Sequence, residues 1–426
     1  MPRLNNPEML KILRDLEKGF PEMISRGRDF WRSFEDLELS SLWEEGGGTL
    51  RFTPYLQETP AWDALWTRFG WLEETLTVIS ARLNRLGKLL SEWGAQELSQ
   101  EVNNFGALLT QWRDEVARIL EADLEREVAW LEKGERGGLA LRLAPLEVGS
   151  VLAEELFAKK RAVIMTSATL RVGGGFDYFS RQVGLEAFPR EKVDFCQVDS
   201  PFDYARQALV CLVEGLPSPA HQDEESYAAA VAPLLARTLP AIGGRTLILC
   251  TSHRFLRELY QLLTDTLGAT CVLAQGITGT RAKLVEEFCQ TEKAVLLGAN
   301  TYWEGLDLPG DLLKGVIIPR LPFPSPGHPL QAARTERLSA QGENPFMALS
   351  LPKALLRFRQ GFGRLIRSAA DRGVFIILDQ RVLSRKYGEC FLKVLPPASL
   401  SKVSPEELPG EIKRWFGGAP PDGKNL

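Results

Sequence analysis

Between residues 72 and 119, apolar side chains recur every three or four positions, the spacing of one face of a helix. One such stripe runs from Leu72 to Trp93 and a second from Val102 to Ile119, with Gly94 and polar residues between them. Two amphipathic helices joined by a short link pack as an antiparallel hairpin. We therefore predict a helical hairpin here, with both stripes in its core and neither serving as a cofactor-binding or DNA-reading surface.

From about residue 143 the pattern changes to short, uninterrupted apolar runs separated by helical segments. The strand candidates lie at 162–165, 208–213, 246–250, 294–297, 315–318 and 374–378. Continuous apolar runs of this length predict a parallel sheet covered on both faces, and hence an α/β fold. The polar, proline-bearing stretch that begins at Pro217 is a candidate domain boundary. From Pro420 onward we expect a disordered tail.

Composition narrows the class of protein. The 426 residues favour two or three domains, and a hydrophobic share of 44% supplies real cores. A net charge of −4 excludes an overall basic field, so a DNA-binding protein of this composition needs a local basic groove. No two of the six cysteines are spaced as a metal-binding pair, which favours reduced thiols. With no signal segment and no apolar run of about 18 residues, we predict a cytoplasmic protein without a membrane partner.

In a parallel sheet the working residues follow the carboxyl ends of the strands. The run TSATL at 166–170 follows the first strand candidate, and its hydroxyl residues are Thr166, Ser167 and Thr169. These hydroxyls either contact phosphate or simply form a polar exit from the strand. After the strand at 246–250, Thr251 or Ser252 either caps the next helix or, with the helix amides, also binds a phosphate.

A third post-strand segment spans residues 298–310 and contains the run TYWEGLDLPG. Gly305 permits close approach of the backbone to a ligand, and Asp307 offers a carboxylate to a ribose hydroxyl. Tyr302 and Trp303 either stack on nucleic-acid bases or pack beneath the loop.

The fourth segment, at 360–367, reads QGFGRLIR. If it is helical, Gln360, Arg364 and Arg367 share one face. Two guanidinium groups on one face can hold a γ-phosphate and neutralise the charge of its transfer. The alternative is a solvated arginine face, but the spacing favours the phosphate role for Arg364 and Arg367.

Taken in order, these motifs resemble the DinG/XPD-like helicases of superfamily 2. The resemblance is carried by runs that lie at 144–148 (APLEV), 166–170 (TSATL), 200–204 (SPFDY), 249–252 (LCTS), 302–310 (YWEGLDLPG), 321–323 (LPF) and 360–367 (QxxGRxxR). It covers residues 125–390 well and residues 1–125 only by position and helical texture. It implies ATP-driven 5′-to-3′ movement on single-stranded DNA by two RecA-like domains with ATP between them.

The resemblance also implies roles for single residues. Arg364 and Arg367 would face the γ-phosphate, with Arg367 as the arginine finger, and Gln360 would orient the nucleotide or water. Further residues would line the nucleotide cleft, namely Glu304, Gly305 and Asp307. The hydroxyl residues of TSATL (Thr166, Ser167 and Thr169) would couple hydrolysis to the grip on DNA. The residues expected to lie toward DNA are Thr251, Ser252 and Trp303.

Two motifs that such a helicase needs are not found. The sequence contains no G-x-x-x-x-G-K-S/T phosphate loop, and no Asp-Glu-x-His run follows a strand. We therefore expect ATP and Mg²⁺ to be bound mainly by an N-terminal half that is a second chain or a missing segment. None of the six cysteines inherits the family's iron–sulfur role.

The predicted domains are a helical Arch-like region at 1–142, a remnant of the first RecA-like domain at 143–216, a second RecA-like domain at 217–400 and a tail at 401–426. The leading functional hypothesis is the C-terminal part of an ATP-dependent DNA helicase that is inactive alone. The second is an ATPase-deficient DNA-binding or interaction protein with a helicase-like fold. The third is an unrelated sheet-and-helix enzyme.

Overall fold

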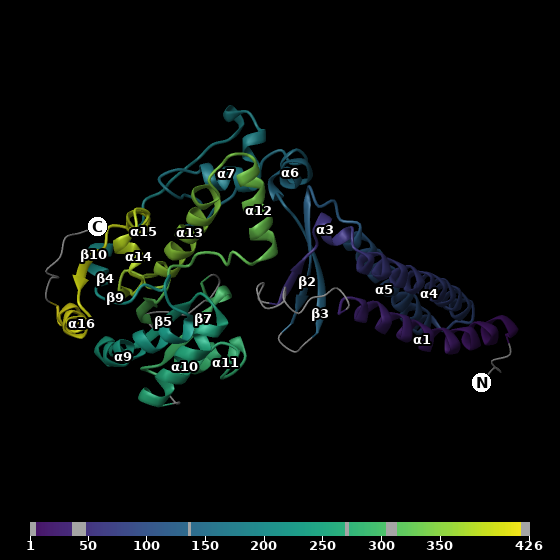
Figure 1. The fold of residues 1–426 in the computed structure, drawn as a ribbon, viewed down its shortest axis with the longest axis horizontal. Helices are drawn as coiled ribbons and strands as arrows, with labels where there is room; N and C mark the ends of the chain where they lie inside the picture. The colour runs from purple at the N-terminus through teal and green to yellow at the C-terminus, as the bar shows by residue number, and fades with distance from the viewer. Residues whose placement is uncertain (1–5, 36–47, 135–137, 269–271, 304–312, 419–426) are drawn as a thin grey trace. The chain divides into compact units, whose positions relative to one another are not determined.

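The computed structural model describes residues 6–35, 48–134, 138–268, 272–303 and 313–418 (Figure 1). The chain folds into two units, and each unit is built from two separate stretches of the sequence. The first unit comprises residues 1–148 together with 325–342, and the second comprises 149–324 together with 343–426.

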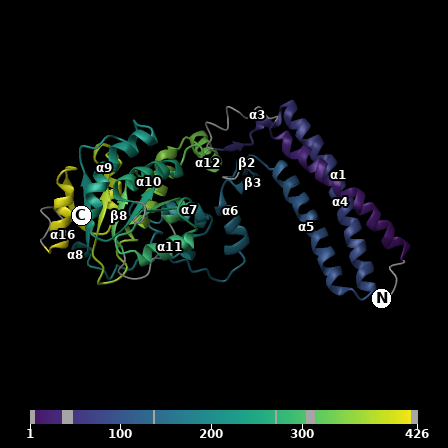
Figure 2. The same ribbon diagram turned by 90° about the horizontal axis from the view of Figure 1, so that it is seen from below.

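The first unit combines long helices with a small sheet. Its helices are α1 (Pro7–Ser33), α3 (Pro54–Gln57), α4 (Pro60–Glu92), α5 (Gln96–Leu120) and α12 (Pro329–Ala340). Its strands are β1 (Thr49–Arg51), β2 (Glu127–Lys133) and β3 (Leu139–Pro145), which form an antiparallel sheet in the order β1-β2-β3. In Figure 2, α1, α4 and α5 lie side by side.

The predicted helical hairpin is confirmed as α4 and α5, which pack along each other and are joined at residues 93–95. The stripe of α4 is buried from Leu72 to Leu86, as expected. The stripe of α5 packs on the same cores but is mostly half-buried, with Val116 buried and Phe105 43% exposed. Gly106 of α5 is also buried, and a Cβ there would lie 3.3 Å from Leu83 Cβ, so the two helices approach closely at this glycine.

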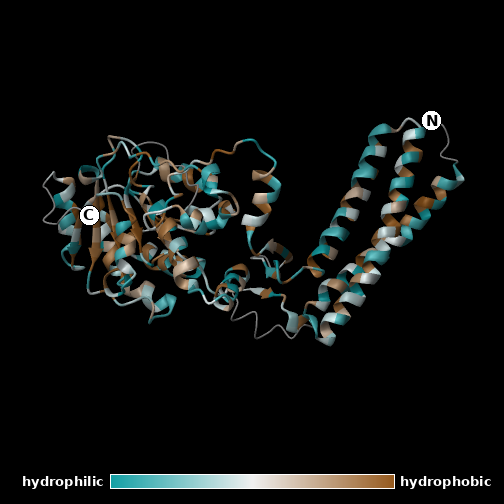
Figure 3. Ribbon diagram, turned by 90° about the horizontal axis from the view of Figure 1, so that it is seen from above, coloured by the Kyte–Doolittle hydropathy of each residue, from teal (hydrophilic) through white to brown (hydrophobic). Residues whose placement is uncertain are grey.

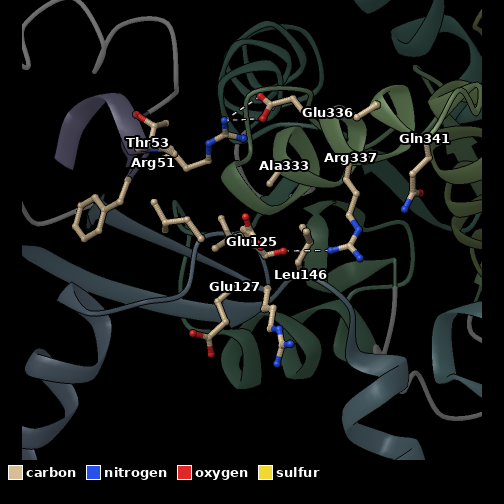
Figure 4. Close-up of a pocket in the computed structure, with 15 residues that line it drawn as sticks. Arg51, Thr53, Glu125, Glu127, Leu146, Ala333, Glu336, Arg337 and Gln341 are labelled. Atoms are coloured by element: carbon tan, nitrogen blue, oxygen red, sulfur yellow. Dashed lines mark hydrogen bonds and ion pairs between the residues drawn. The ribbon is translucent and has the colours of Figure 1, made fainter. Parts of the chain in front are cut away.

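Helix α12 belongs to the first unit although it lies far away in the sequence. It packs on the β1–β2 side of the small sheet, where Arg51 Nη2 donates to both carboxylate oxygens of Glu336, at 2.9 and 2.8 Å. Arg334 Nε donates to the carbonyl oxygen of Leu146 over 2.7 Å. A cavity of about 620 Å³ lies between α12 and the segments that flank β1 and β2 (Figure 4).

Among the described residues, the second unit contains one seven-stranded sheet, in which every pairing is parallel. The order is β10-β4-β9-β8-β5-β7-β6. The strands are β4 (Ala208–Val213), β5 (Arg245–Cys250), β6 (Val272–Ala274), β7 (Val295–Ala299), β8 (Leu313–Ile318), β9 (Gly373–Ile377) and β10 (Ser399–Val403). Figure 3 shows these strands as largely hydrophobic, which fits a sheet buried on both faces.

Helices cover both faces of this sheet. One face packs on α9 (Glu224–Ile242), α10 (His253–Leu267) and α16 (Leu408–Phe416). The other packs on α11 (Arg281–Gln290), α13 (Leu351–Phe362) and α15 (Gly388–Lys393). Shorter helices of the unit are α6 (Val148–Leu152), α7 (Asp177–Val183), α8 (Tyr204–Gln207) and α14 (Arg381–Ser384). The α/β architecture predicted from the apolar runs is therefore confirmed, and five of those runs coincide with β4, β5, β7, β8 and β9.

The sixth run was predicted wrongly. Residues 162–165 form no strand, and within the described part of the chain nothing pairs with them. The side chain of Ile164 is 93% exposed, and Val163 and Met165 are each 37% exposed. A strand needs a neighbour to satisfy its backbone groups, so an apolar run alone does not make one.

The structure also divides the chain differently from the predicted domains. The stretch at Pro217 does not separate units, because β4 before it and β5 after it belong to one sheet. Residues from 401 onward are not simply a tail, since β10 pairs with β4 and α16 packs on α9. Buried Leu408, Ile412 and Trp415 hold α16 in place. The tail predicted from Pro420 lies outside the described residues.

Candidate functional site

The candidate site lies at the carboxyl edge of the sheet, where the segment after β7 meets the end of β5. Trp303 is 1% exposed, and its indole Nε1 donates to the carbonyl oxygen of Cys250 over 2.9 Å. Tyr302 packs against Gly298, where an added Cβ would lie only 2.4 Å from the Tyr302 ring. The start of this segment is thus fixed to two neighbouring strands.

This burial decides between the two interpretations of the aromatic pair. Tyr302 and Trp303 are each 1% exposed, so neither ring has an open face on which a base could stack. The Trp303 ring is therefore packed within the fold instead of being available for stacking, while the prediction that Trp303 lies toward DNA stays a prediction. The reason is that the glycine at 298 and the glycine at 361 leave space that these rings fill.

Ser252 has the geometry of a helix cap. Its Oγ accepts the backbone N–H of Phe255 at 3.0 Å, which satisfies an amide at the start of α10. Its hydroxyl also donates to Glu224 Oε1 over 2.6 Å. The cap interpretation is confirmed, while phosphate binding by Thr251 or Ser252 stays a prediction.

The segment that carries the two arginines is not a continuous helix. Helix α13 ends at Phe362, and the next turn is closed by hydrogen bonds from Arg364 N to Gly361 O and from Leu365 N to Phe362 O. Leu365 and Ile366 are 2% and 3% exposed and turn the chain into the core. The expectation that Gln360, Arg364 and Arg367 share one helical face is therefore wrong.

Arg364 nevertheless contacts Trp303, at the start of the segment after β7. Arg364 Nη2 donates to the carbonyl oxygen of Trp303 over 3.1 Å. Gly361 lets α13 approach closely, because an added Cβ there would meet the Trp303 ring at 3.2 Å. Gln360 Oε1 is buried and accepts no hydrogen bond from any residue that the structure describes. The predicted cleft residues Glu304, Gly305 and Asp307 lie outside the described residues.

Arg367 begins a short loop that is held by two side chains the sequence did not single out. The Asp371 carboxylate accepts the backbone N–H of Arg367 at 2.6 Å and that of Ser368 at 2.7 Å. Gln207 Nε2 donates to the carbonyl oxygens of Ser368 and Asp371, at 2.8 and 3.0 Å. A serine followed three residues later by an aspartate is a turn signal that identifies this loop, but nothing in the sequence points to Gln207.

In the TSATL segment, Thr166 and Ser167 are exposed and Thr169 is half-buried. Ser167 Oγ lies 3.1 Å from Thr169 Oγ1 and accepts the backbone N–H of Thr169 at 3.2 Å. Just beyond it, Arg359 Nη1 on α13 donates to the carbonyl oxygen of Arg171 over 3.3 Å. Burial lowers the pKa of Arg359 below its ordinary value. A hydrogen bond therefore joins the backbone just after this segment to α13, the helix that also carries Gln360.

In the described ranges no three or more of His, Cys, Asp and Glu gather as a metal site. Cys211 and Cys250 are buried in strands, and burial raises the pKa of both thiols. No helix in the described part of the chain is long and apolar enough to cross a membrane.

Comparison with known proteins gives consistent matches. Residues 235–398 match the helicase C-terminal domain family. The protein named 3'-5' exonuclease DinG of Bacillus subtilis is 41% identical over 289 residues, which cover 66% of this chain and 31% of the relative. The protein named ATP-dependent DNA helicase YoaA of Haemophilus influenzae is 33% identical over 341 residues, covering 80% of this chain and 51% of the relative.

Among solved structures, one described as XPD_Helicase aligns with 75% of this chain and 55% of its own, at 16% identity and a TM-score of 0.49. The chain matches between 31% and 51% of the length of the two sequence relatives.

Proposed function

We propose that this chain, which belongs to the DinG/XPD-like helicase family, supplies the second RecA-like motor domain of an ATP-dependent DNA helicase. The second unit, which contains the seven-stranded parallel sheet, is the RecA-like helicase domain. The observation that carries the proposal is the contact of Arg364 with the Trp303 carbonyl, because it brings the arginine motif to the segment that leads into Glu304 and Asp307.

In this proposal Arg367 and Arg364 approach the γ-phosphate of ATP and offset the charge that builds up during its transfer. Gln360, whose Oε1 has no partner among the described residues, is suited to orient the attacking water. Glu304, Gly305 and Asp307 bind the nucleotide. ATP and Mg²⁺ are held mainly by a phosphate-binding domain outside these 426 residues, in the same polypeptide or in another.

The exposed apolar segment around Ile164 supports the proposal that a phosphate-binding domain binds to this chain. Ile164 is 93% exposed, and Val198 in the same unit is 85% exposed. Exposed apolar residues in an extended, unpaired segment suit addition to the edge of another sheet. We expect the phosphate-binding domain to pair with residues 162–165 and turn them into the strand that their composition favours.

Single-stranded DNA is the proposed polymer substrate, with movement in the 5′-to-3′ direction that the family resemblance implies. We assign to Thr166, Ser167 and Thr169 the coupling of hydrolysis to DNA binding. The hydrogen bond from Arg359 to the Arg171 carbonyl supports this assignment, because it joins the following backbone to α13. Thr251 and Ser252 remain candidates for a backbone phosphate at the start of α10.

The test is DNA-stimulated ATP hydrolysis by the chain alone and by the chain combined with a phosphate-binding domain of a relative. We expect no hydrolysis alone and clear hydrolysis in the combination. Hydrolysis by the chain alone would contradict the proposal. Binding of DNA without hydrolysis in any combination would instead support the second hypothesis, an ATPase-deficient DNA-binding protein.

A further inference from the structure

We infer that Asp371 and Gln207 are positioning residues that fix the backbone of Arg367 for its role at the γ-phosphate. The inference rests on the proposed function, and it concerns two side chains that have no expected contact with ATP. Asp371 and Gln207 are each 7% exposed. Both form hydrogen bonds with the loop at 367–371.

The Asp371 carboxylate closes the loop from within. Its Oδ2 accepts two successive backbone N–H groups, those of Arg367 at 2.6 Å and Ser368 at 2.7 Å. Its Oδ1 accepts the Ser368 hydroxyl at 2.8 Å. Hydrogen bonds to a charged acceptor are shorter and stronger than those between neutral groups, so this single side chain fixes the orientation of two peptide units.

Gln207 holds the same loop from outside. It ends α8 and precedes β4, and it is more than 160 residues away from the loop in sequence. Its Nε2 group carries two hydrogens, and both have an acceptor, because the carbonyl oxygens of Ser368 and Asp371 lie at 2.8 and 3.0 Å. The loop is therefore attached to the start of β4, next to the edge strand β10, as well as to its own carboxylate.

Without these side chains the loop has little to define it. The backbone closes it with one hydrogen bond, from Asp371 N to Ser368 O, at 3.4 Å. On the amino-terminal side, Leu365 and Ile366 are buried. On the other side, Gly373 allows the chain to pass Lys314, whose carbonyl oxygen would lie 2.9 Å from an added Cβ. Arg367 thus lies between the buried residues Leu365 and Ile366 and a loop that the Asp371 and Gln207 side chains hold in place.

The arrangement matters for catalysis because misplacement of a catalytic group by about 1 Å can cost roughly a hundredfold in rate. A guanidinium that stabilises charge only as the phosphoryl group transfers contributes to kcat more than to KM. Loss of the Asp371 or Gln207 hydrogen bonds should therefore lower kcat and leave the KM for ATP nearly unchanged. Because unfolding also lowers the apparent kcat at an unchanged KM, each rate is divided by the folded fraction measured by circular dichroism.

The first test uses the chain by itself and measures hydrogen exchange at the amides of Arg367 and Ser368. We expect both amides to be protected, and Asp371→Ala to remove that protection. Ser368→Ala is the matched control, because it removes the hydroxyl contact and keeps both amide bonds to the carboxylate. Unprotected amides in the unchanged chain, or protection that survives Asp371→Ala, would overturn the inference whatever the protein does with ATP.

The second test measures ATP hydrolysis by the chain combined with its phosphate-binding domain. We expect Asp371→Ala and Gln207→Ala to lower kcat by about ten- to a hundredfold, with KM for ATP changed less than about threefold. Thr238→Val is the control for loss of a buried hydrogen bond, since the Thr238 hydroxyl donates to Leu234 O over 2.7 Å within α9. This control should leave kcat unchanged.

A double variant separates this inference from the proposed function. If Asp371 acts through Arg367, Asp371→Ala should cost no further rate once Arg367→Ala is present. Additive losses would mean that Asp371 acts by another route and would overturn the inference. Full activity of Arg367→Ala alone would instead contradict the role proposed for Arg367, while the exchange measurement would still report on the loop.

Discussion

Trp303 and Cys250 are joined by a hydrogen bond of 2.9 Å from the indole Nε1 to a backbone carbonyl, across the ends of two neighbouring strands. The bond fixes the start of the segment that follows β7 to the end of β5. Arg364 donates to the carbonyl oxygen of the same Trp303. Trp303 therefore contacts both the end of β5 and the arginine motif, and it fixes the start of the segment that continues to Glu304.

Trp303→Phe tests this structural role against a role in DNA binding. The variant retains an aromatic ring but leaves the buried Cys250 carbonyl without its donor, which should cost about 1–3 kcal/mol of unfolding free energy. Urea denaturation would measure that loss. Affinity for single-stranded DNA should stay within about twofold, because the ring is buried. A large loss of affinity without a loss of stability would restore the stacking interpretation.

Gly361→Ala should perturb the contact between α13 and the loop after β7. The added Cβ would lie 3.0 Å from Leu249 Cδ1 and 3.2 Å from the Trp303 ring, so the helix must shift by a few tenths of an ångström. We expect a loss of stability of about 1–3 kcal/mol, together with reduced ATP hydrolysis in the combined system.

Gly363→Ala is the matched control for Gly361→Ala. Its added Cβ would meet its nearest atoms, two backbone carbonyl oxygens, at 3.5 Å, and its φ of −62° suits alanine. Thermal unfolding should show this variant to be as stable as the unchanged chain or slightly more stable. Equal effects at the two positions would mean that the close packing at Gly361 is unimportant.

Ile164→Asp tests the docking segment. Because Ile164 is 93% exposed, the substitution should change the stability of the chain by less than about 0.5 kcal/mol. It should strongly weaken association with the phosphate-binding domain, since a carboxylate would enter a buried strand. Calorimetric titration of the two components would measure this. Ile24→Asp is the control, since Ile24 on α1 is 50% exposed and lies outside the segment; an equal effect there would contradict the assignment.

The Arg51–Glu336 ion pair can be tested by exchange of its charges. Glu336→Arg alone places two guanidinium groups together and should loosen α12, with faster thermolysin cleavage within residues 325–342. Adding Arg51→Glu should restore protection. The expected change in stability is below about 1 kcal/mol, because the Glu336 side chain is 62% exposed. Failure of the double variant to recover protection would show that the pair does not hold the helix.

The sequence predicted the sheet well because its strands are apolar on both faces, a pattern that few other structures share. Residues 162–165 have the same composition and form no strand, because strand formation depends on a neighbour that composition does not reveal. The end of α13 was missed for a different reason. Leu365 and Ile366 fit a helical spacing, yet burial against the sheet favours a turn after Phe362.

The site was predicted in part. The motif spacing singled out Arg364, whose Nη2 donates to the Trp303 carbonyl in the structure, while the roles of Gln360, Arg364 and Arg367 stay predictions. It did not identify Gln207, because a single glutamine before a strand carries no signal until the fold brings it to Ser368. The burial of the Trp303 ring could not be predicted for a related reason, since exposure of an aromatic side chain is decided by packing and not by its neighbours in sequence.

The position of α12 has a practical consequence for dissecting the molecule. The chain leaves the second unit after Pro324 and re-enters it at Glu343, while Leu330 and Ala333 of α12 pack against Trp130 and Leu146. A truncation that begins at residue 149 would therefore keep the helix but remove the surface it covers, exposing apolar side chains to water. An isolated motor domain should be made instead by replacing residues 325–342 with a short flexible linker, so that solubility is not lost together with the first unit.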